Sequence, residues 1–362
     1  MSKIVSIGTA LPAYRHNQDN ILQFMQQLYG MNETDKRKLR FLYRQAGISA
    51  RHSSIADYSQ PMHEWKFYPQ SENVEPFPTL EQRMDWFQKF APPLSVDAIQ
   101  KCLDNTLNVA EITHLITVSC TGLSAPGLDL QVMELMDLPK DVFRTSVNFM
   151  GCYAAIHALK LADIICRATP DAKVLIVCTE LCTLHLQKKP TPDNLASGLL
   201  FSDGSAAVLV TGDLHPAKGI RLNSFYSEVV TKGKNDMAWE LSSTGFQMTL
   251  SGYVPNLIEQ DIARLVEKAL AKQGISRSSI TNWCIHPGGR KILEAVQKSL
   301  EIEKHELNSS YNILDQFGNM SSATILFVLK DMLPSIQQKE NSKIFAVAFG
   351  PGLTMETFIA EA

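Results

Sequence analysis

The sequence contains no long apolar run and no excess of charge of one sign. No segment approaches the roughly 18 consecutive apolar residues that a membrane-spanning helix needs. Its 34 lysines and arginines are balanced by 37 acidic residues, which gives a formal net charge of −3. Nucleic-acid binding depends on a strongly basic surface. We therefore expect neither a membrane span nor a nucleic-acid partner.

The cysteine content does not suggest a disulfide framework. Seven cysteines, an odd number, favour free thiols in a reducing compartment. The first residues predict a strand over Ile4–Ile7, ended by Pro12, rather than a secretory signal. Cys178, Cys182 and His185 have a spacing seen in zinc sites, but no second Cys/His pair completes a set. We expect a cytoplasmic protein without a metal or redox cofactor.

The chain is long enough for two domains, or for one fold built of two halves. It has 362 residues, of which 45% are hydrophobic. Short β-rich runs at 115–119, 173–178, 206–211 and 343–349 alternate with helical patterns. One short helix is predicted near 80–90 and another from Val96. Such alternation is typical of an α/β fold with buried strands.

A repeat divides the sequence. A helix, strand, helix, glycine turn, helix and strand follow one another from Val96, and the same order returns about 170 residues later, from Asp261. The glycine turns contain Gly151 in the first copy and Gly318 in the second. The repeat predicts two copies of one α/β half, over residues 1–213 and 217–362.

The repeat also predicts that three reactive side chains meet where the halves join. Cys152 and Asn319 each follow the turn glycine of one copy, and His286 ends a strand of the second copy. The partial positive charge of a helix N-terminus should lower the pKa of the thiol and favour neutral imidazole. Cysteine can hold an acyl group as a thioester, while histidine and asparagine donate hydrogen bonds to a developing oxyanion or enolate.

Each of these residues also has a structural interpretation when it is taken alone. A free cysteine often serves as a small buried apolar residue. A single histidine is more often structural than catalytic, and asparagine is among the best helix N-caps. The repeat and the combination of the three favour the catalytic interpretation.

Five motifs give the chain a family resemblance. They are GCYAA at 151–155, LLFSDGSAAVLV at 199–210, HPGGRKIL at 286–293, FGNMSSATILFVL at 317–329 and FGPGLTMET at 349–357. With them the chain resembles the type III polyketide synthases, the chalcone-synthase-like enzymes, and in particular bacterial-type members. The resemblance implies a thiolase-type fold with duplicated αβαβα layers, a homodimer, and coenzyme A (CoA) thioesters as substrates.

The resemblance also assigns roles to residues. Cys152 matches the nucleophile, and His286 and Asn319 match the pair that promotes decarboxylation. Phe201 matches the aromatic gate between the CoA tunnel and the cavity; a strand-edge core aromatic is the alternative. The expected cavity residues are Met248, Cys120, Thr121, Ala125, Cys182 and Ser321.

Departures from plant members point to the kind of starter. Met248 stands where plant enzymes carry a second gating phenylalanine, and Ala125 replaces a larger wall residue. Cys182 and His185 replace cavity hydroxyl groups. We expect a roomier or less polar cavity than that of chalcone synthase, suited to an alkyl starter or a longer chain.

The CoA phosphates require cations, and the basic residues near the N-terminus do not align cleanly with those of the family. The candidates are Arg40 and Arg44, within a basic cluster that also contains Lys36, Arg37 and Lys38, and Arg51 as a weaker one. A solvated helix face explains the cluster equally well.

These inferences lead to one expected reaction and two alternatives. We expect a starter acyl-CoA to load Cys152, and malonyl-CoA to extend it by repeated decarboxylative condensation until the chain cyclises to a pyrone, a resorcinol or a related polyketide. The first alternative is a β-ketoacyl-carrier-protein synthase III type enzyme that condenses once. The second is an inactive thiolase-fold subunit, against which the intact Cys, His and Asn argue.

Overall fold

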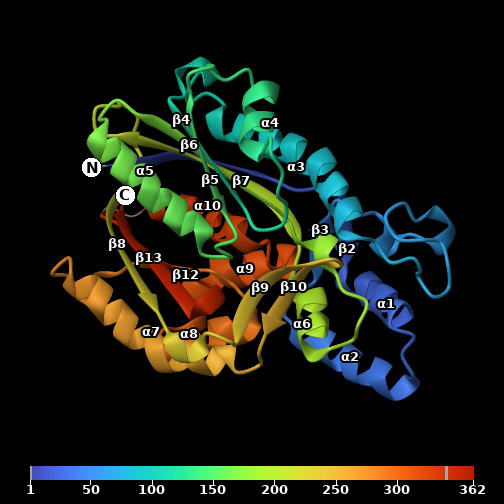
Figure 1. Ribbon diagram of the computed structural model, residues 1–362. Helices are drawn as coiled ribbons and strands as arrows, with labels where there is room; N and C mark the ends of the chain where they lie inside the picture. The colour runs from blue at the N-terminus through green and yellow to red at the C-terminus, as the bar shows by residue number, and fades with distance from the viewer. Residues whose placement is uncertain (1, 339–340) are drawn as a thin grey trace.

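A computed structural model describes residues 2–338 and 341–362. Its main feature is a mixed nine-stranded sheet in the order β11-β12-β13-β8-β1-β7-β6-β4-β5 (Figure 1). The strands of this sheet are β1 (Ser2–Ala10), β4 (His114–Ser119), β5 (Phe143–Asn148), β6 (Lys173–Leu181), β7 (Asp203–Gly212), β8 (Ile220–Val229), β11 (Asn282–Ile285), β12 (Lys343–Gly350) and β13 (Thr354–Glu361).

Helices pack on the faces of this sheet. The α-helices that the structure describes are α1 (Gln18–Leu28), α2 (Glu33–Gln45), α3 (Leu80–Leu103), α4 (Leu128–Leu135), α5 (Ala154–Ala168), α6 (Pro192–Leu200), α7 (Val254–Ala271), α8 (Arg290–Leu300), α9 (Asn308–Phe317) and α10 (Thr324–Gln337). Two small sheets pair β2 (Tyr14–Asn17) with β3 (Ala50–Ser53), and β9 (Met237–Ser242) with β10 (Gly245–Leu250).

The strand order shows the internal duplication. On one side of the sheet the order of strands toward its centre is β4, β6, β7 and β1. On the other side the corresponding order toward the centre is β11, β12, β13 and β8. The parallel pair β4–β6 corresponds to β11–β12, and the antiparallel pair β6–β7 to β12–β13. The two series meet where β1 pairs antiparallel with β8, from Ser2↔Leu222 to Ile4↔Ile220. One continuous sheet therefore crosses from the first half of the chain to the second.

Strand β12 shows why these segments fold as doubly covered strands. Ile344, Ala346 and Ala348 pack into one hydrophobic cluster, while Phe345 and Val347 pack into another. Side chains of a strand alternate between the two faces of its sheet. Because both sets are apolar and buried, the strand needs a layer of helices on each side.

Three hydrophobic cores produce five layers. The central core contains residues of α5, α10 and strands of both halves. One outer core joins α3 and α4 to the first half, and the other joins α7 and α8 to the second. Figure 1 shows α5 and α10 between the two halves of the sheet, α3 and α4 on one outside, and α7 and α8 on the opposite outside. This is the αβαβα arrangement of the thiolase-type fold.

Helix α3 departs from the sequence-based expectation. A single helix replaces the predicted short helix near 80–90 and the second one from Val96, although Pro92 and Pro93 lie inside it. Proline removes a helical hydrogen bond and usually ends a helix. Ala91, Pro92 and Leu94 are buried against the sheet, so tertiary packing overrides the local signal.

Candidate active site

Cys152 lies in a tight turn directly before α5. Gly151 precedes it with φ +81°, and a Cβ there would lie 2.3 Å from Cδ of Pro351. Only glycine fits this conformation without displacing its neighbour. The Gly151 N–H points to Sγ of Cys120, 3.0 Å away. The turn therefore connects the Cys152 segment to both halves of the chain.

His286 follows the last residue of β11. Its N–H donates to the carbonyl of Val347 at 2.9 Å, which continues the parallel ladder with β12. The side chain is buried, and neither ring nitrogen has a hydrogen-bond partner among the residues that the structure describes. Burial lowers the pKa of His286 to about 3, so the imidazole is neutral at physiological pH.

Asn319 has a defined side-chain orientation. Its Oδ1 accepts hydrogen bonds from the N–H of Ser321 at 2.9 Å and from Oγ1 of Thr324 at 3.3 Å. Its Nδ2 donates to the carbonyl of Gly288 at 3.3 Å. A backbone N–H can only donate, so the contact with Ser321 identifies the oxygen of the carboxamide. The second N–H of Nδ2 remains for a ligand.

The thiol of Cys152 points to the same place. It donates to Oδ1 of Asn319 at 3.9 Å. Burial raises the pKa of Cys152 to about 12, and hydrogen bonds with Ser321 and Asn319 oppose that change while the nearby Glu180 carboxyl adds to it. The lowered thiol pKa expected from a helix N-terminus is therefore wrong for the free enzyme, because α5 begins only at Ala154 and desolvation dominates.

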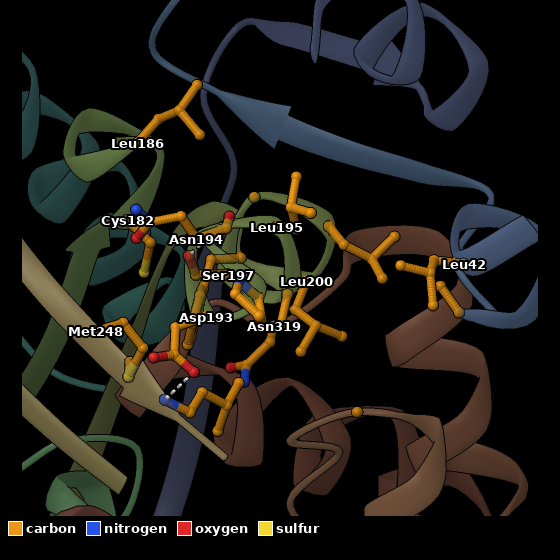
Figure 2. A pocket seen from close by; sticks show the side chains of 18 of the residues that line it. Leu42, Cys182, Leu186, Asp193, Asn194, Leu195, Ser197, Leu200, Met248 and Asn319 are labelled. Atoms are coloured by element: carbon orange, nitrogen blue, oxygen red, sulfur yellow. Dashed lines mark hydrogen bonds between the residues drawn. The ribbon is translucent and has the colours of Figure 1, made fainter. Parts of the chain in front are cut away.

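The three residues line one cavity of about 940 Å³. Figure 2 shows its wall around α6, with Asn319 behind the helix, Met248 and Cys182 toward one side and Leu42 of α2 toward the other. Most of the predicted cavity residues also line it: Phe201, Met248, Cys120, Thr121, Cys182 and Ser321. Ala125 does not; it is exposed on the loop before α4.

Phe201 is joined to Asn319 through the backbone. It forms an isolated parallel bridge with Asn319. The N–H of Asn319 donates to the carbonyl of Leu200, and the N–H of Ser202 donates to the carbonyl of Asn319, both at 2.9 Å. The end of α6 thus places Phe201 beside the turn that presents Asn319.

An aromatic wall was only partly anticipated from the sequence, which pointed to His185 but not to Phe246 or Trp239. His185 stacks on Phe246 with ring centroids 4.2 Å apart, and Trp239 meets both rings edge-on. Trp239 Nε1 donates to the carbonyl of Cys120 at 2.7 Å. His185 and Trp239 line the cavity, so they narrow it on the side of the β9–β10 hairpin. No local signal marks Trp239, because β9 meets Cys120 only in the fold.

Glu180 is a second residue that the sequence did not reveal. Its buried carboxyl accepts from the N–H of Cys120 and from Oγ1 of Thr121, both at 2.9 Å, and from Oγ of Ser322 at 2.5 Å. Burial raises the pKa of this carboxyl. Glu180 ties the Cys120–Thr121 segment of the first half to the Asn319 turn of the second.

The predicted CoA-binding arginines are distributed differently from expectation. Arg40 and Arg44 are exposed on α2 but lie outside the cavity lining, to which α2 contributes Lys38. Arg290 and Lys291 add two further cations there. Arg51 is only 4% exposed, and its Nη1 donates to the carbonyl of Phe201 at 2.6 Å. Arg51 does line the cavity, but its guanidinium is bound to Gln18 and to the carbonyl of Phe201 rather than free on the surface.

Within 2–338 and 341–362, no three His, Cys, Asp or Glu side chains gather as a metal site would require. No helix in the same ranges is both long and apolar enough to cross a membrane.

Comparison with known proteins identifies the family. Residues 1–214 match the N-terminal domain of the chalcone and stilbene synthases, and residues 221–362 match the C-terminal domain. The chain belongs to this family. It is a type III polyketide synthase by homology, an acyltransferase of the condensing-enzyme class.

Individual relatives agree over nearly the whole chain. The alpha-pyrone synthesis polyketide synthase-like Pks18 of Mycobacterium tuberculosis is 31% identical over 98% of this chain and 89% of its own length. A putative chalcone synthase of Bacillus subtilis is 30% identical, over 99% and 98%. A probable polyketide synthase of Dictyostelium discoideum is 28% identical over 98% of this chain, which spans only 11% of that much longer protein.

A solved structure supports the fold. Polyketide synthase PKS-I from the brown alga Ectocarpus siliculosus superposes with a TM-score of 0.92 at 26% sequence identity, over 99% of this chain and 98% of the other. The thiolase-type fold predicted from the sequence is confirmed.

Proposed function

We propose that the enzyme extends an acyl-CoA starter with malonyl-CoA by repeated decarboxylative condensation and releases a pyrone, a resorcinol or a related polyketide. The observation that carries this proposal is the convergence of Cys152, His286 and Asn319, from both halves of the chain, on one cavity. Nucleophile, proton acceptor and hydrogen-bond donor are the groups that thioester condensation needs.

Loading begins with a protonated thiol and a neutral imidazole. His286 accepts the thiol proton as Sγ of Cys152 attacks the carbonyl carbon of the starter. A carbon–sulfur bond to Cys152 forms, the bond to the CoA sulfur breaks, and the departing thiolate takes the proton. The high thiol pKa and the low imidazole pKa disfavour this transfer in the resting enzyme, which supports a proton transfer that accompanies the attack.

Extension uses the two hydrogen-bond donors. Malonyl-CoA loses carbon dioxide, and the electron pair of the broken carbon–carbon bond forms an enolate. An N–H of His286 and the free N–H of Asn319 Nδ2 stabilise the enolate oxygen. The enolate carbon then attacks the acyl thioester, and Cys152 leaves as a thiolate. No metal or redox cofactor is needed for these steps, since decarboxylation and thioester cleavage supply the driving force.

The walls around the nucleophile support an alkyl starter. Cys120, Cys182 and Met248 present sulfur and methylene groups instead of hydroxyls, and such groups contact a hydrocarbon without losing hydrogen bonds to water. Lys38, Arg290 and Lys291 at the lining are the candidate contacts for the CoA phosphates. The name of the Mycobacterium relative points to an alpha-pyrone product.

A homodimer is part of the proposal. Strand β5 ends the sheet with an unpaired edge, and its Phe143 is 62% exposed. Leu135 of α4 and Ile164 of α5, two helices that contact β5, are also exposed. An open strand edge beside apolar side chains favours pairing with a second copy. We place the dimer in the cytoplasm, with all seven cysteines as free thiols.

One experiment tests the reaction and the starter together. Purified enzyme is incubated with radiolabelled malonyl-CoA and aliphatic or aromatic acyl-CoA starters, beside Cys152→Ala and the control Cys166→Ala, a buried cysteine of α5 outside the site. Alkyl pyrones or resorcinols that disappear only in Cys152→Ala support the proposal. Turnover confined to aromatic starters contradicts the alkyl assignment, and turnover confined to malonyl-carrier protein contradicts the reaction.

A further inference from the structure

Arg51 is a buried cation without a matching carboxylate. Its side chain is 4% exposed, and no carboxylate of the described ranges lies within ion-pair distance. Burying a charged group costs several kcal/mol unless other contacts compensate. Hydrogen bonds of Nη1 and Nε supply part of this compensation, while Nη2 has no partner among the described residues.

The hydrogen bonds of Arg51 lead to the end of α6. Its Nη1 donates to the carbonyl of Phe201 at 2.6 Å, and its Nε donates to Oε1 of Gln18 at 3.0 Å. Gln18 in turn donates from Nε2 to the carbonyl of Leu199 at 3.1 Å. The last carbonyls of a helix have no partner inside the helix, so Arg51 and Gln18 satisfy two of the carbonyls at this end.

The carbonyl of Leu200, between those of Leu199 and Phe201, binds the turn that contains Asn319. The carbonyl of Leu200 accepts from the N–H of Asn319 at 2.9 Å. The carbonyls of Leu199, Leu200 and Phe201 are therefore bound by Gln18, Asn319 and Arg51 in sequence. A shift in either outer carbonyl moves the one that orients Asn319.

Arg51 also packs directly against the turn. A Cβ at Gly318 would lie 3.0 Å from both Cγ and Cδ of Arg51 and 2.9 Å from the carbonyl of Leu200. The absence of a side chain at Gly318 lets the arginine stem and the end of α6 close on the residue before Asn319. The contact and the hydrogen bonds thus act on the same short segment.

We propose that Arg51, supported by Gln18, is a positioning residue that sets the direction of the Asn319 carboxamide during decarboxylation. This inference rests on the proposed function for its kinetic readout, since Asn319 donates there to the enolate oxygen. Errors of about 1 Å in the position of such a donor can cost on the order of a hundredfold in rate.

Arg83 provides a matched control. It is fully buried, and it too donates to backbone carbonyls, those of Pro78 and Leu184. It does not line the cavity, and among the described residues it makes no hydrogen bond to α6 or the Asn319 turn. Arg51→Lys and Arg83→Lys therefore make the same chemical change at two buried sites, of which only one touches the turn.

The test is a double-mutant cycle on malonyl-CoA decarboxylation. We expect Arg51→Lys to lower kcat at least about tenfold with KM within about threefold, because lysine cannot bind Phe201 and Gln18 together. In an Asn319→Ala background the same change should alter kcat less than about twofold, because the group it positions is gone. Arg83→Lys should stay within about twofold in both backgrounds.

A second readout does not depend on the reaction. Hydrogen–deuterium exchange of the peptides covering 197–203 and 317–322 should increase in Arg51→Lys and not in Arg83→Lys. If Arg51→Lys does not fold, Gln18→Leu takes its place, since it removes one side of the same network.

Equal losses of kcat in both Asn319 backgrounds, or unchanged exchange of the two peptides, overturn the inference. Failure of the wild type to decarboxylate malonyl-CoA, with the exchange result intact, overturns the proposed function alone.

Discussion

The charge state of His286 follows from its surroundings. The ring is buried with no described hydrogen-bond partner, and burial lowers its pKa to about 3 from an ordinary value near 6.5. The imidazole therefore stays neutral down to about pH 4, and it gains a proton only below that. Between pH 5 and 8 it can donate an N–H to an enolate without any change of charge.

We therefore expect malonyl-CoA decarboxylation to be flat in pH across this range. The measurement is carbon dioxide release by Cys152→Ala, in which the thiol cannot contribute its own titration. The rate should vary less than about twofold from pH 5 to 8. An inflection near pH 6.5, absent from a His286→Gln variant, would show an exposed and titrating imidazole instead.

The sequence predicts which residues form the candidate site better than it predicts their surroundings. Cys152 and Asn319 were found because each follows a turn glycine with a positive φ in an internal repeat. Trp239 and Glu180 carry no such mark, since each reaches the site from a distant strand. The pKa of Cys152 was missed for the same reason: it depends on how many atoms of remote segments exclude water from the thiol.

Among the structural elements, the turn between α9 and α10 carries the sharpest requirement. Gly318 ends α9 with φ 67° and ψ −156°, a backbone region that is almost confined to glycine. We expect Gly318→Ala to lower the free energy of unfolding by about 1–3 kcal/mol. Decarboxylation should fall at least about tenfold, because the new Cβ pushes on Leu200 and Arg51 and moves Asn319.

Gly274→Ala separates the two effects. Gly274 also has a positive φ, +63°, but no atom lies within 4 Å of a Cβ built there. This variant should lose about 1 kcal/mol of stability in urea unfolding and keep its decarboxylation rate. An unchanged rate in Gly318→Ala would show that the turn tolerates displacement and that Asn319 is not tightly positioned.

The elements themselves were predicted where local pattern and burial agree. The apolar runs at 173–178 and 343–349 became β6 and β12, because both faces of each strand are covered. Around Pro92 and Pro93 the local sequence pattern predicts a break but the segment is buried, and α3 continues through the prolines. The β9–β10 hairpin was not foreseen at all, although it brings Trp239 and Met248 to the cavity.

For the whole molecule, the repeat explains how one site draws on both halves. The two strand series meet at β1 and β8, and the central layer brings α5 and the N-terminal end of α10 to the same core. Cys152 of the first copy and the carboxamide of Asn319 of the second therefore lie close together. What the repeat does not predict is the difference between the copies: β5 extends the first series, and no described strand extends the second.

Both β11 and β5 end the nine-stranded sheet, but β11 is buried while β5 is largely exposed, and the proposed dimer would cover the β5 edge. Phe143 of β5 is 62% exposed, and an apolar ring on an unpaired edge is unfavourable for a free monomer. We expect sedimentation velocity to give about 80 kDa for the wild type, twice the 40.3 kDa of one chain. Phe143→Asp should shift the population toward the monomer, because it would bury two unpaired carboxylates at a twofold contact.

Leu214→Asp is the matched control for that experiment. Leu214 is even more exposed, at 74%, but it lies in the turn after β7 rather than on the sheet edge. The Leu214→Asp variant should have the same sedimentation coefficient as the wild type. A monomeric wild type would contradict the dimer, and equal dissociation of both variants would contradict its placement at β5. Because Cys152, His286 and Asn319 line one cavity of a single chain, we expect the monomeric variant to retain malonyl-CoA decarboxylation.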